Sequence, residues 1–274
     1  MNATFTDEEL RFEFGENWSR FIENLNEEQI LEAEKSLKSM LKVESLTGKR
    51  FLDIGNGSGL FSLAALRLGA SYVRSFDYDI QSVNCALELK RRFFPNSAAW
   101  QIEQGSALDQ SFLGTLGKFD IVYSWGVLHH TGSMWQALQN AILPLEAKGL
   151  LFISIYNDQG RMSEMWTRIK RTYNALPSRL KFLALFPSFF LVYGMKIAGD
   201  LLRGRPMHFF KNYAKSRGMS PWRDLVDWVG GYPFEVAKPD DIIEFYLSNG
   251  LDLRRLKTVG CGHGCNEFVF QRGS

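Results

Sequence analysis

The stretch FLDIGNGSG, residues 51–59, decides the fold because it joins a short apolar strand to a glycine-rich turn. Its glycines alternate with other residues, at Gly55, Gly57 and Gly59. Glycine lets the backbone turn tightly and approach a ligand with no side chain in the way. The apolar run LFSLAAL at residues 60–66 follows directly and predicts a helix. The sequence therefore predicts a strand, a ligand-binding loop and a helix in succession.

Short apolar strands and helices alternate along the chain on the C-terminal side of this corner. Hydrophobic periodicity predicts helices at 20–46, 58–69, 80–93, 133–143 and 239–249, and strands at 72–77, 98–103, 119–124, 149–156, 251–259 and 266–271. A glycine-rich turn joins the last two strands as a hairpin. Alternation at this rhythm predicts an α/β fold with a mostly parallel sheet that helices cover on both faces.

The spacing of the glycines separates two classes of nucleotide-binding loop. A dinucleotide loop follows the pattern G-x-G-x-x-G, but here Leu60 stands after Gly59 and the glycines alternate strictly. With Asp53 two residues before Gly55, the loop resembles motif I of the class I S-adenosylmethionine (SAM) methyltransferases. The resemblance implies a Rossmann-like sheet of seven strands with an antiparallel C-terminal hairpin. It also implies SAM as cofactor and S-adenosylhomocysteine as product.

Polar residues at the ends of the predicted strands are candidates for holding this cofactor, because ligands bind beyond the carboxyl ends of parallel strands. Asp77 ends the second strand, where an acid accepts hydrogen bonds from ribose hydroxyls. Asp53 either orders the loop amides, meets the amino group of the ligand or caps the following helix. The predicted cofactor-binding residues are Asp53, Gly55, Asn56, Gly57, Gly59, Asp77, Tyr78, Ser106, Ala107, Ser124 and Trp125.

Three of these residues have a plain structural alternative. Ser106 and Ala107 follow the third strand, where the family takes its adenine contacts, but small residues are common after any strand. Asp77 and Asp79 lie in the segment FDYDI, where aspartate also favours a turn.

The fourth predicted strand ends in SWGVLHHT, residues 124–131, which resembles the same segment of methyltransferases related to the ubiquinone and menaquinone methylases. His129 and His130 are therefore candidate catalytic bases, because the unperturbed pKa of imidazole lies near 6.5. A base helps when the methyl acceptor is a hydroxyl, so the pair favours transfer to oxygen. The alternative is that each histidine bonds to loop backbone and shapes the turn.

The cysteines and charges limit the remaining function classes. Cys261 and Cys265 flank His263 in a pattern that partly resembles a zinc site, but the chain has only three cysteines and four histidines, and we expect no metal. We expect His263, Asn266 and Glu267 to lie near the acceptor instead. Three cysteines make no disulfide framework, and the N-terminus has no signal-peptide pattern, so we expect a cytoplasmic protein.

The middle of the chain is strongly basic and reads as an insertion. Residues 161–223 hold 13 Lys and Arg against Glu164 and Asp200, a formal charge of +11, which leaves −9 elsewhere. A helix is expected at 161–175, and the apolar run at 182–195 is shorter than the ~20 residues that cross a bilayer. Its basic flanks are typical of an interfacial helix that contacts a membrane, or of a lid for an anionic or lipid-like acceptor. A cap with solvated charges is the alternative.

These observations predict four segments: an N-terminal helical lead-in at 1–49, a SAM-binding core at 50–156, a basic helical insertion at 157–232 and the closing helix and hairpin at 233–274. The expected function is methyl transfer from SAM to a small molecule, with the insertion setting the choice of acceptor. The alternatives are an RNA- or protein-directed methyltransferase, a noncatalytic SAM-binding subunit and an NAD-dependent oxidoreductase.

Overall fold

The computed structural model describes residues 10–12, 14–205, 208–210, 213, 221–260, 262 and 264–273. The chain divides into two compact units, which are described separately. The sheet unit comprises Glu13–Gln159 and Glu235–Ser274, and the helical unit comprises Gly160–Phe234 with the N-terminal stretch that ends at Phe12. The predicted insertion at 157–232 overlaps almost all of the helical unit.

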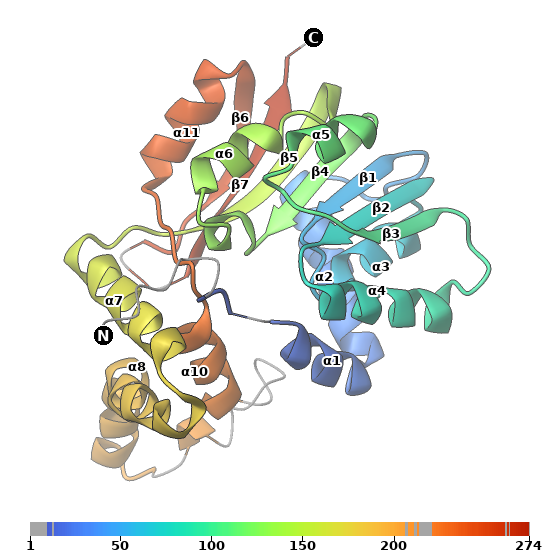
Figure 1. The fold of residues 1–274 in the computed structure, drawn as a ribbon. Helices are drawn as coiled ribbons and strands as arrows, with labels where there is room; N and C mark the ends of the chain where they lie inside the picture. Colours follow the sequence, from blue (N-terminus) through green and yellow to red (C-terminus); the bar gives the residue numbers. More distant parts are fainter. Residues whose placement is uncertain are drawn as a thin grey trace. The chain divides into compact units, whose positions relative to one another are not determined.

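The sheet unit contains one seven-stranded sheet with the order β3-β2-β1-β4-β5-β7-β6 (Figure 1). Its strands are β1 Arg50–Ile54, β2 Tyr72–Asp77, β3 Trp100–Gln104, β4 Phe119–Trp125, β5 Leu145–Tyr156, β6 Leu251–Lys257 and β7 Cys265–Arg272. β1 to β5 pair in parallel, and β7 runs antiparallel to both β5 and β6. The predicted fold class, including the closing antiparallel hairpin, is confirmed.

Helices cover both faces of the sheet because its central strands are apolar on both sides. Buried side chains of α2 (Glu27–Leu41), α3 (Leu60–Arg67) and α4 (Ile80–Phe93) form one core cluster. Those of α5 (Gln110–Thr115), α6 (Met134–Asn140) and α11 (Pro239–Ser248) form the other. α1 (Gly15–Glu23) packs against α4. The order of the strands reverses between β1 and β4, which places the ligand crevice of such sheets at the end of β1.

The structure divides one predicted helix and adds two. The helix expected at 20–46 is two helices, α1 and α2, because Asn26 begins a new one. The Asn26 side chain accepts the backbone N–H of Gln29, whose side chain accepts the backbone N–H of Asn26. α5 and α10 (Pro221–Gly230) were not expected. The predicted helices at 80–93 and 161–175 match α4 and α7 (Arg161–Ala175) at both ends.

The helical unit is built around α7, α8 (Phe182–Leu202) and α10, which contact one another in pairs, with a short 3₁₀ helix, η2, at Ser178–Leu180. α8 continues seven residues beyond the predicted apolar run, through Lys196 and Asp200. Among the described residues, the segment Ser178–Leu202 is long and apolar enough, by length and composition alone, to cross a membrane. The apolar run at 182–195 was expected to be too short for a bilayer, but it lies within a longer helix, whose length alone does not exclude a span.

We expect Phe152→Ala to lower the free energy of unfolding of the sheet unit by about 3–5 kcal/mol, the usual cost of truncating a core aromatic side chain. Phe152 is fully buried on β5, and its ring lies edge-on to Tyr123 with the ring centroids 5.1 Å apart. Urea denaturation followed by circular dichroism measures the change. The control is Leu247→Ala, because the side chain of Leu247 on α11 is exposed. This substitution should shift the free energy of unfolding by no more than about 0.5 kcal/mol. Equal losses in both variants would show that Phe152 does not stabilise the core as described.

Candidate functional site

The loop between β1 and α3 requires its three glycines. Gly55, Gly57 and Gly59 have φ angles of +76°, +51° and +82°, a region that L-amino acids with side chains rarely adopt. There is also no room for side chains: a β-carbon on Gly55 would lie 2.3 Å from a methyl carbon of Val127, and one on Gly59 would lie 2.8 Å from the β-carbon of Ala86. The backbone of the loop is therefore bare where the sequence predicts a ligand.

Asn56 holds the loop from inside. Its buried side-chain amide donates to the carbonyls of Gly57 and Ser82, at 3.1 and 3.4 Å. Its Oδ1 atom is buried and has no hydrogen-bond partner among the residues that the structure describes. Asn56 thus shapes the loop through its NH₂ group and keeps one acceptor atom available.

Asp77 lies beside the loop at the end of β2. One carboxylate oxygen accepts the Gly57 backbone N–H at 2.9 Å, and the other accepts the Asp79 backbone N–H at 2.9 Å. Desolvation raises the pKa of Asp77 to about 6, and these hydrogen bonds oppose the rise. The structure therefore brings the predicted ribose acid into contact with the predicted loop. Asp79 is a helix cap, because its side chain accepts the Gln81 backbone N–H at the start of α4.

Asp53 is almost completely buried below the loop on β1. Its carboxylate accepts the Ser62 hydroxyl of α3 at 2.7 Å. Burial raises the pKa of Asp53 to about 7, the Ser62 hydrogen bond lowers it, and the negative charge of Asp77 adds to the rise. Of the three roles considered for Asp53, this contact comes closest to capping the helix after the loop, because Ser62 lies in the first turn of α3.

The remaining predicted cofactor residues differ in exposure. Tyr78, directly after β2, is 48% exposed. Trp125, the last residue of β4, is 44% exposed. Ser124 is fully buried and donates its hydroxyl to the Ile54 carbonyl at 2.9 Å, so it joins β4 to β1 beneath the loop. Ser106 accepts the Leu108 backbone N–H, which is a local turn contact. The Ala107 carbonyl accepts the side-chain amide of Asn140, at 2.9 Å.

The two histidines occupy different environments on the short 3₁₀ helix η1, Leu128–His130. His129 is fully buried, and its ring centroid lies 4.0 Å from that of Tyr156. Its Nδ1 atom accepts the Tyr156 backbone N–H at 3.4 Å, and its carbonyl accepts the Glu235 backbone N–H at 3.0 Å. His130 is partly exposed, with its ring centroid 5.2 Å from that of Phe14. Of these two histidines, His130 is therefore the one with access to solvent.

Residues of α1 contact the loop, although the sequence analysis did not include them in the site. The Gly15 backbone N–H donates to the Asp79 carboxylate at 2.8 Å. A β-carbon on Gly57 would lie 3.1 Å from the Trp18 indole, so this ring lies against the loop. Gly15 and Trp18 belong to the segment FGENW at 14–18, and no local pattern connects this segment to residues some 40 to 60 positions away.

The C-terminal hairpin supplies structural contacts at the residues expected near the acceptor. Cys261 and His263 lie outside the described residues. Asn266 is buried, donates to the Asn157 side chain at 3.0 Å and accepts the Val259 backbone N–H at 3.1 Å. Glu267 pairs with Lys257 at 2.8 Å. Within the described ranges, no group of three His, Cys, Asp or Glu side chains is arranged to hold a metal ion.

Solved structures with this fold include methyltransferases. Magnesium protoporphyrin IX methyltransferase from Synechocystis, crystallised with bound SAM, aligns over 100% of both chains with a TM-score of 0.56 and 13% sequence identity. The [4+2]-cyclase SpnF aligns over 89% of this chain and 80% of its own, with a TM-score of 0.54 and 10% identity. At such low identity the likeness establishes the shared fold, and these two neighbours differ in their named activities.

Curated relatives match less than half of this chain. Ubiquinone biosynthesis O-methyltransferase of Glaesserella parasuis is 33% identical over 116 residues, which are 42% of this chain and 49% of that protein. The tRNA U34 carboxymethyltransferase of Ectopseudomonas mendocina is 33% identical over 88 residues, 32% of this chain and 26% of that protein. The chain thus spans about half the length of the first relative and about a quarter of the second.

The sequence profile of a protein family, described as a methyltransferase domain, matches residues 24–189. This range begins before α2, includes the glycine loop, Asp77 and both histidines, and ends within α8. The match covers more than half of the 274 residues. The chain therefore belongs to the methyltransferase domain family.

Proposed function

We propose that this protein transfers the methyl group of SAM to an oxygen atom of a small-molecule acceptor and releases S-adenosylhomocysteine. The observation that carries the proposal is the contact between the Asp77 carboxylate and the Gly57 backbone N–H, at the edge of the sheet where the strand order reverses. The family match supports a methyltransferase and lends no support to an NAD-dependent oxidoreductase.

The residues at this edge fit SAM. An ionised carboxylate offers about four acceptor positions. Asp77 accepts the backbone N–H groups of Gly57, Asp79 and Tyr78, and the remaining capacity suits a ribose hydroxyl. The loop presents backbone without side chains, and Oδ1 of Asn56 is a further buried acceptor. Tyr78 follows β2 and Trp125 ends β4, the two strands beside β1. The exposed rings of these residues offer apolar area for a purine.

When bound, SAM supplies a methyl group on a positively charged sulfur, which is already electrophilic. The protein therefore has to align the acceptor oxygen, exclude water and remove one proton. We assign the proton to His130, whose ring is partly exposed beside Phe14. His129 is a positioning residue in this scheme, because its buried ring packs against Tyr156 and its backbone anchors the segment that carries Glu235.

The relatives indicate the chemical class of the acceptor only in part. Ubiquinone biosynthesis O-methyltransferase supports transfer to oxygen on a small molecule, whereas the tRNA carboxymethyltransferases match a shorter part of the chain. That the segment 157–232 selects the acceptor stays a prediction.

Incubation with radiolabelled SAM and an extract of the source cells, separated into small-molecule, RNA and protein fractions, tests the acceptor class. Label confined to the RNA or protein fraction would contradict the proposal, and no labelled product would favour a noncatalytic SAM-binding subunit.

Asp77→Ala should weaken SAM binding by about 1.5–3 kcal/mol, the usual value of a hydrogen bond to a charged group. Isothermal titration calorimetry with SAM measures the change. The matched control is Asp120→Ala at the start of β4, where the carboxylate pairs with Lys49 and bonds to the Arg50 backbone N–H. This variant should retain wild-type affinity. Unchanged affinity in Asp77→Ala would remove Asp77 from the cofactor site.

SAM affinity should rise with pH through about 6, the pKa to which desolvation raises Asp77. Below that pH the carboxyl group is protonated and is a poorer acceptor for ribose hydroxyls; above it the ionised form predominates. Calorimetry at several pH values on wild type and Asp77→Asn isolates the effect, since the variant cannot ionise at this position. If both proteins showed the same pH dependence, another group would be responsible.

His130→Ala should lower turnover by about 10²- to 10⁴-fold, the usual contribution of a general base, and leave the dissociation constant of SAM unchanged. The matched variant is His129→Ala, which should lower the melting temperature because it empties a buried position. Turnover is measured once the extract experiment has provided an acceptor, and SAM binding is measured by calorimetry. Equal losses of turnover and SAM affinity in His130→Ala would show that this residue supports the fold of the site instead.

A further inference from the structure

Helix α8 of the helical unit presents large apolar side chains to solvent. Phe182, Phe186 and Phe190 are spaced four residues apart, which places them on one face of a helix, and they are 57%, 65% and 53% exposed. Leu183 and Leu191, beside them, are 55% and 57% exposed. We call these five residues the phenylalanine stripe. Contiguous exposed apolar side chains of this size typically mark a binding surface.

Other side chains fix α8 within its own unit. Leu185, Ser188 and Tyr193 are buried, and α8 packs against α7 and α10. The Tyr193 hydroxyl donates to the Pro221 carbonyl at 2.9 Å. Yet only 17% of the most apolar window of this segment is buried. A helix that is tied to its neighbours on one side and open on the other suits a surface position better than a position surrounded by lipid.

Basic side chains lie at both ends of the stripe. Before it come Arg179 and Lys181, and after it come Lys196, Arg203 and Arg205, with Asp200 as the one acid between Ser178 and Arg205. The Asp200 carboxylate accepts the Phe209 backbone N–H at 2.6 Å, so part of its hydrogen-bonding capacity is used inside the unit. An apolar surface with cationic ends is complementary to a layer that is apolar below and anionic at its surface.

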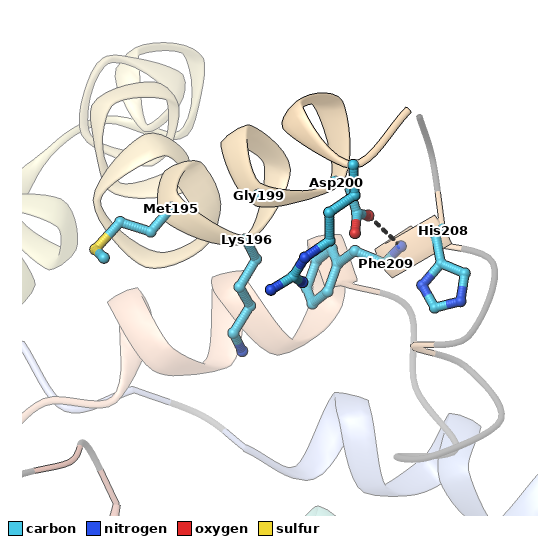
Figure 2. Close-up of a pocket in the computed structure, with 7 residues that line it drawn as sticks. Met195, Lys196, Gly199, Asp200, His208 and Phe209 are labelled. Carbon is cyan, nitrogen blue, oxygen red and sulfur yellow. Dashed lines mark hydrogen bonds between the residues drawn. The ribbon is translucent and has the colours of Figure 1, made fainter. Parts of the chain in front are cut away.

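The C-terminal end of α8 also borders a hollow that could receive a charged group. An open cavity of about 380 Å³ is lined by residues that include Lys196, Arg203 and His208. Figure 2 shows Lys196 and Asp200 on the helix and Phe209 and His208 on the following segment. The lining carries the basic side chains of Lys196 and Arg203 against the one carboxylate of Asp200, an excess of positive charge that suits a phosphate. Met195, which also lines the cavity, is 91% exposed.

We propose that α8 is a peripheral docking surface for a bilayer containing anionic phospholipids. The phenylalanine stripe enters the boundary between headgroups and acyl chains, and the basic residues at its two ends pair with lipid phosphates. The helix lies along the surface and does not cross it. This inference concerns the helical unit and does not depend on the proposed methyl transfer.

Sedimentation of the purified full chain with lipid vesicles tests the proposal. The protein should bind vesicles made of equal parts phosphatidylcholine and phosphatidylglycerol at least tenfold more tightly than vesicles of phosphatidylcholine alone. Raising the salt from about 0.1 M to about 0.5 M should weaken binding, because salt screens the attraction between the basic residues and the lipids. The bound protein should be released by alkaline carbonate, as expected for a peripheral protein.

Two variants separate the apolar and the electrostatic parts. Phe186→Ser with Phe190→Ser should weaken binding to the anionic vesicles about tenfold or more, since both rings are exposed and the fold does not depend on them. Lys181→Gln with Arg203→Gln should weaken it by about fivefold for each charge removed. The control is Leu87→Ser with Leu247→Ser, two exposed leucines of the sheet unit, which should bind as wild type.

Several outcomes would overturn the proposal. Equal binding to both vesicle types, or wild-type binding by the double phenylalanine variant, would show that these residues do not form the surface. Protein that resists carbonate extraction would indicate a membrane-spanning helix. Absence of vesicle binding together with a dimer, dissolved by the phenylalanine substitutions in analytical ultracentrifugation, would assign the stripe to self-association.

Discussion

The hydrogen bond from the Gly57 backbone N–H to the Asp77 carboxylate is the contact on which the site depends, because it ties the loop after β1 to the end of β2. It requires a loop residue with a free amide close to a neighbouring strand, and only glycine allows both the backbone conformation and the close packing. Desolvation makes this carboxylate costly to ionise and therefore raises its pKa. A ligand that donates hydrogen bonds to it would offset that cost.

Burial separates acids and histidines that the sequence presents as near equivalents. Asp53 and Asp77 both lie at the carboxyl ends of strands, but Asp53 is held by the Ser62 hydroxyl below the loop, whereas Asp77 contacts the loop itself. Adjacent His129 and His130 differ in the same way: the first is enclosed against Tyr156, and the second retains access to solvent. In each pair, one member is enclosed within the sheet unit, and the other is the residue to which we assign a role in binding SAM or removing the proton.

The two units differ in how much of their large apolar side chains they bury. In the sheet unit, the large apolar side chains of the central strands are covered on both faces. In α8, phenylalanines and leucines stay exposed over several turns, and basic residues lie at both ends of this stretch. Exposed apolar area of this kind costs free energy in water, so a surface that removes it from water would stabilise the unit.

The sequence by itself determined the alternation of strands and helices, the bare glycine loop and the position of Asp77 one βα unit later, because these depend on local periodicity and on glycine's backbone freedom. It did not reveal the break at Asn26, the contact of Trp18 with Gly57, the burial of His129 or the full length of α8. The break at Asn26 comes from a local capping contact with Gln29, three residues away, and the sequence analysis missed it. The contact of Trp18 and the burial of His129 depend on side chains that only folding brings to one place, and the helix length depends on packing against α7 and α10. Such contacts join distant residues, which local sequence patterns do not encode.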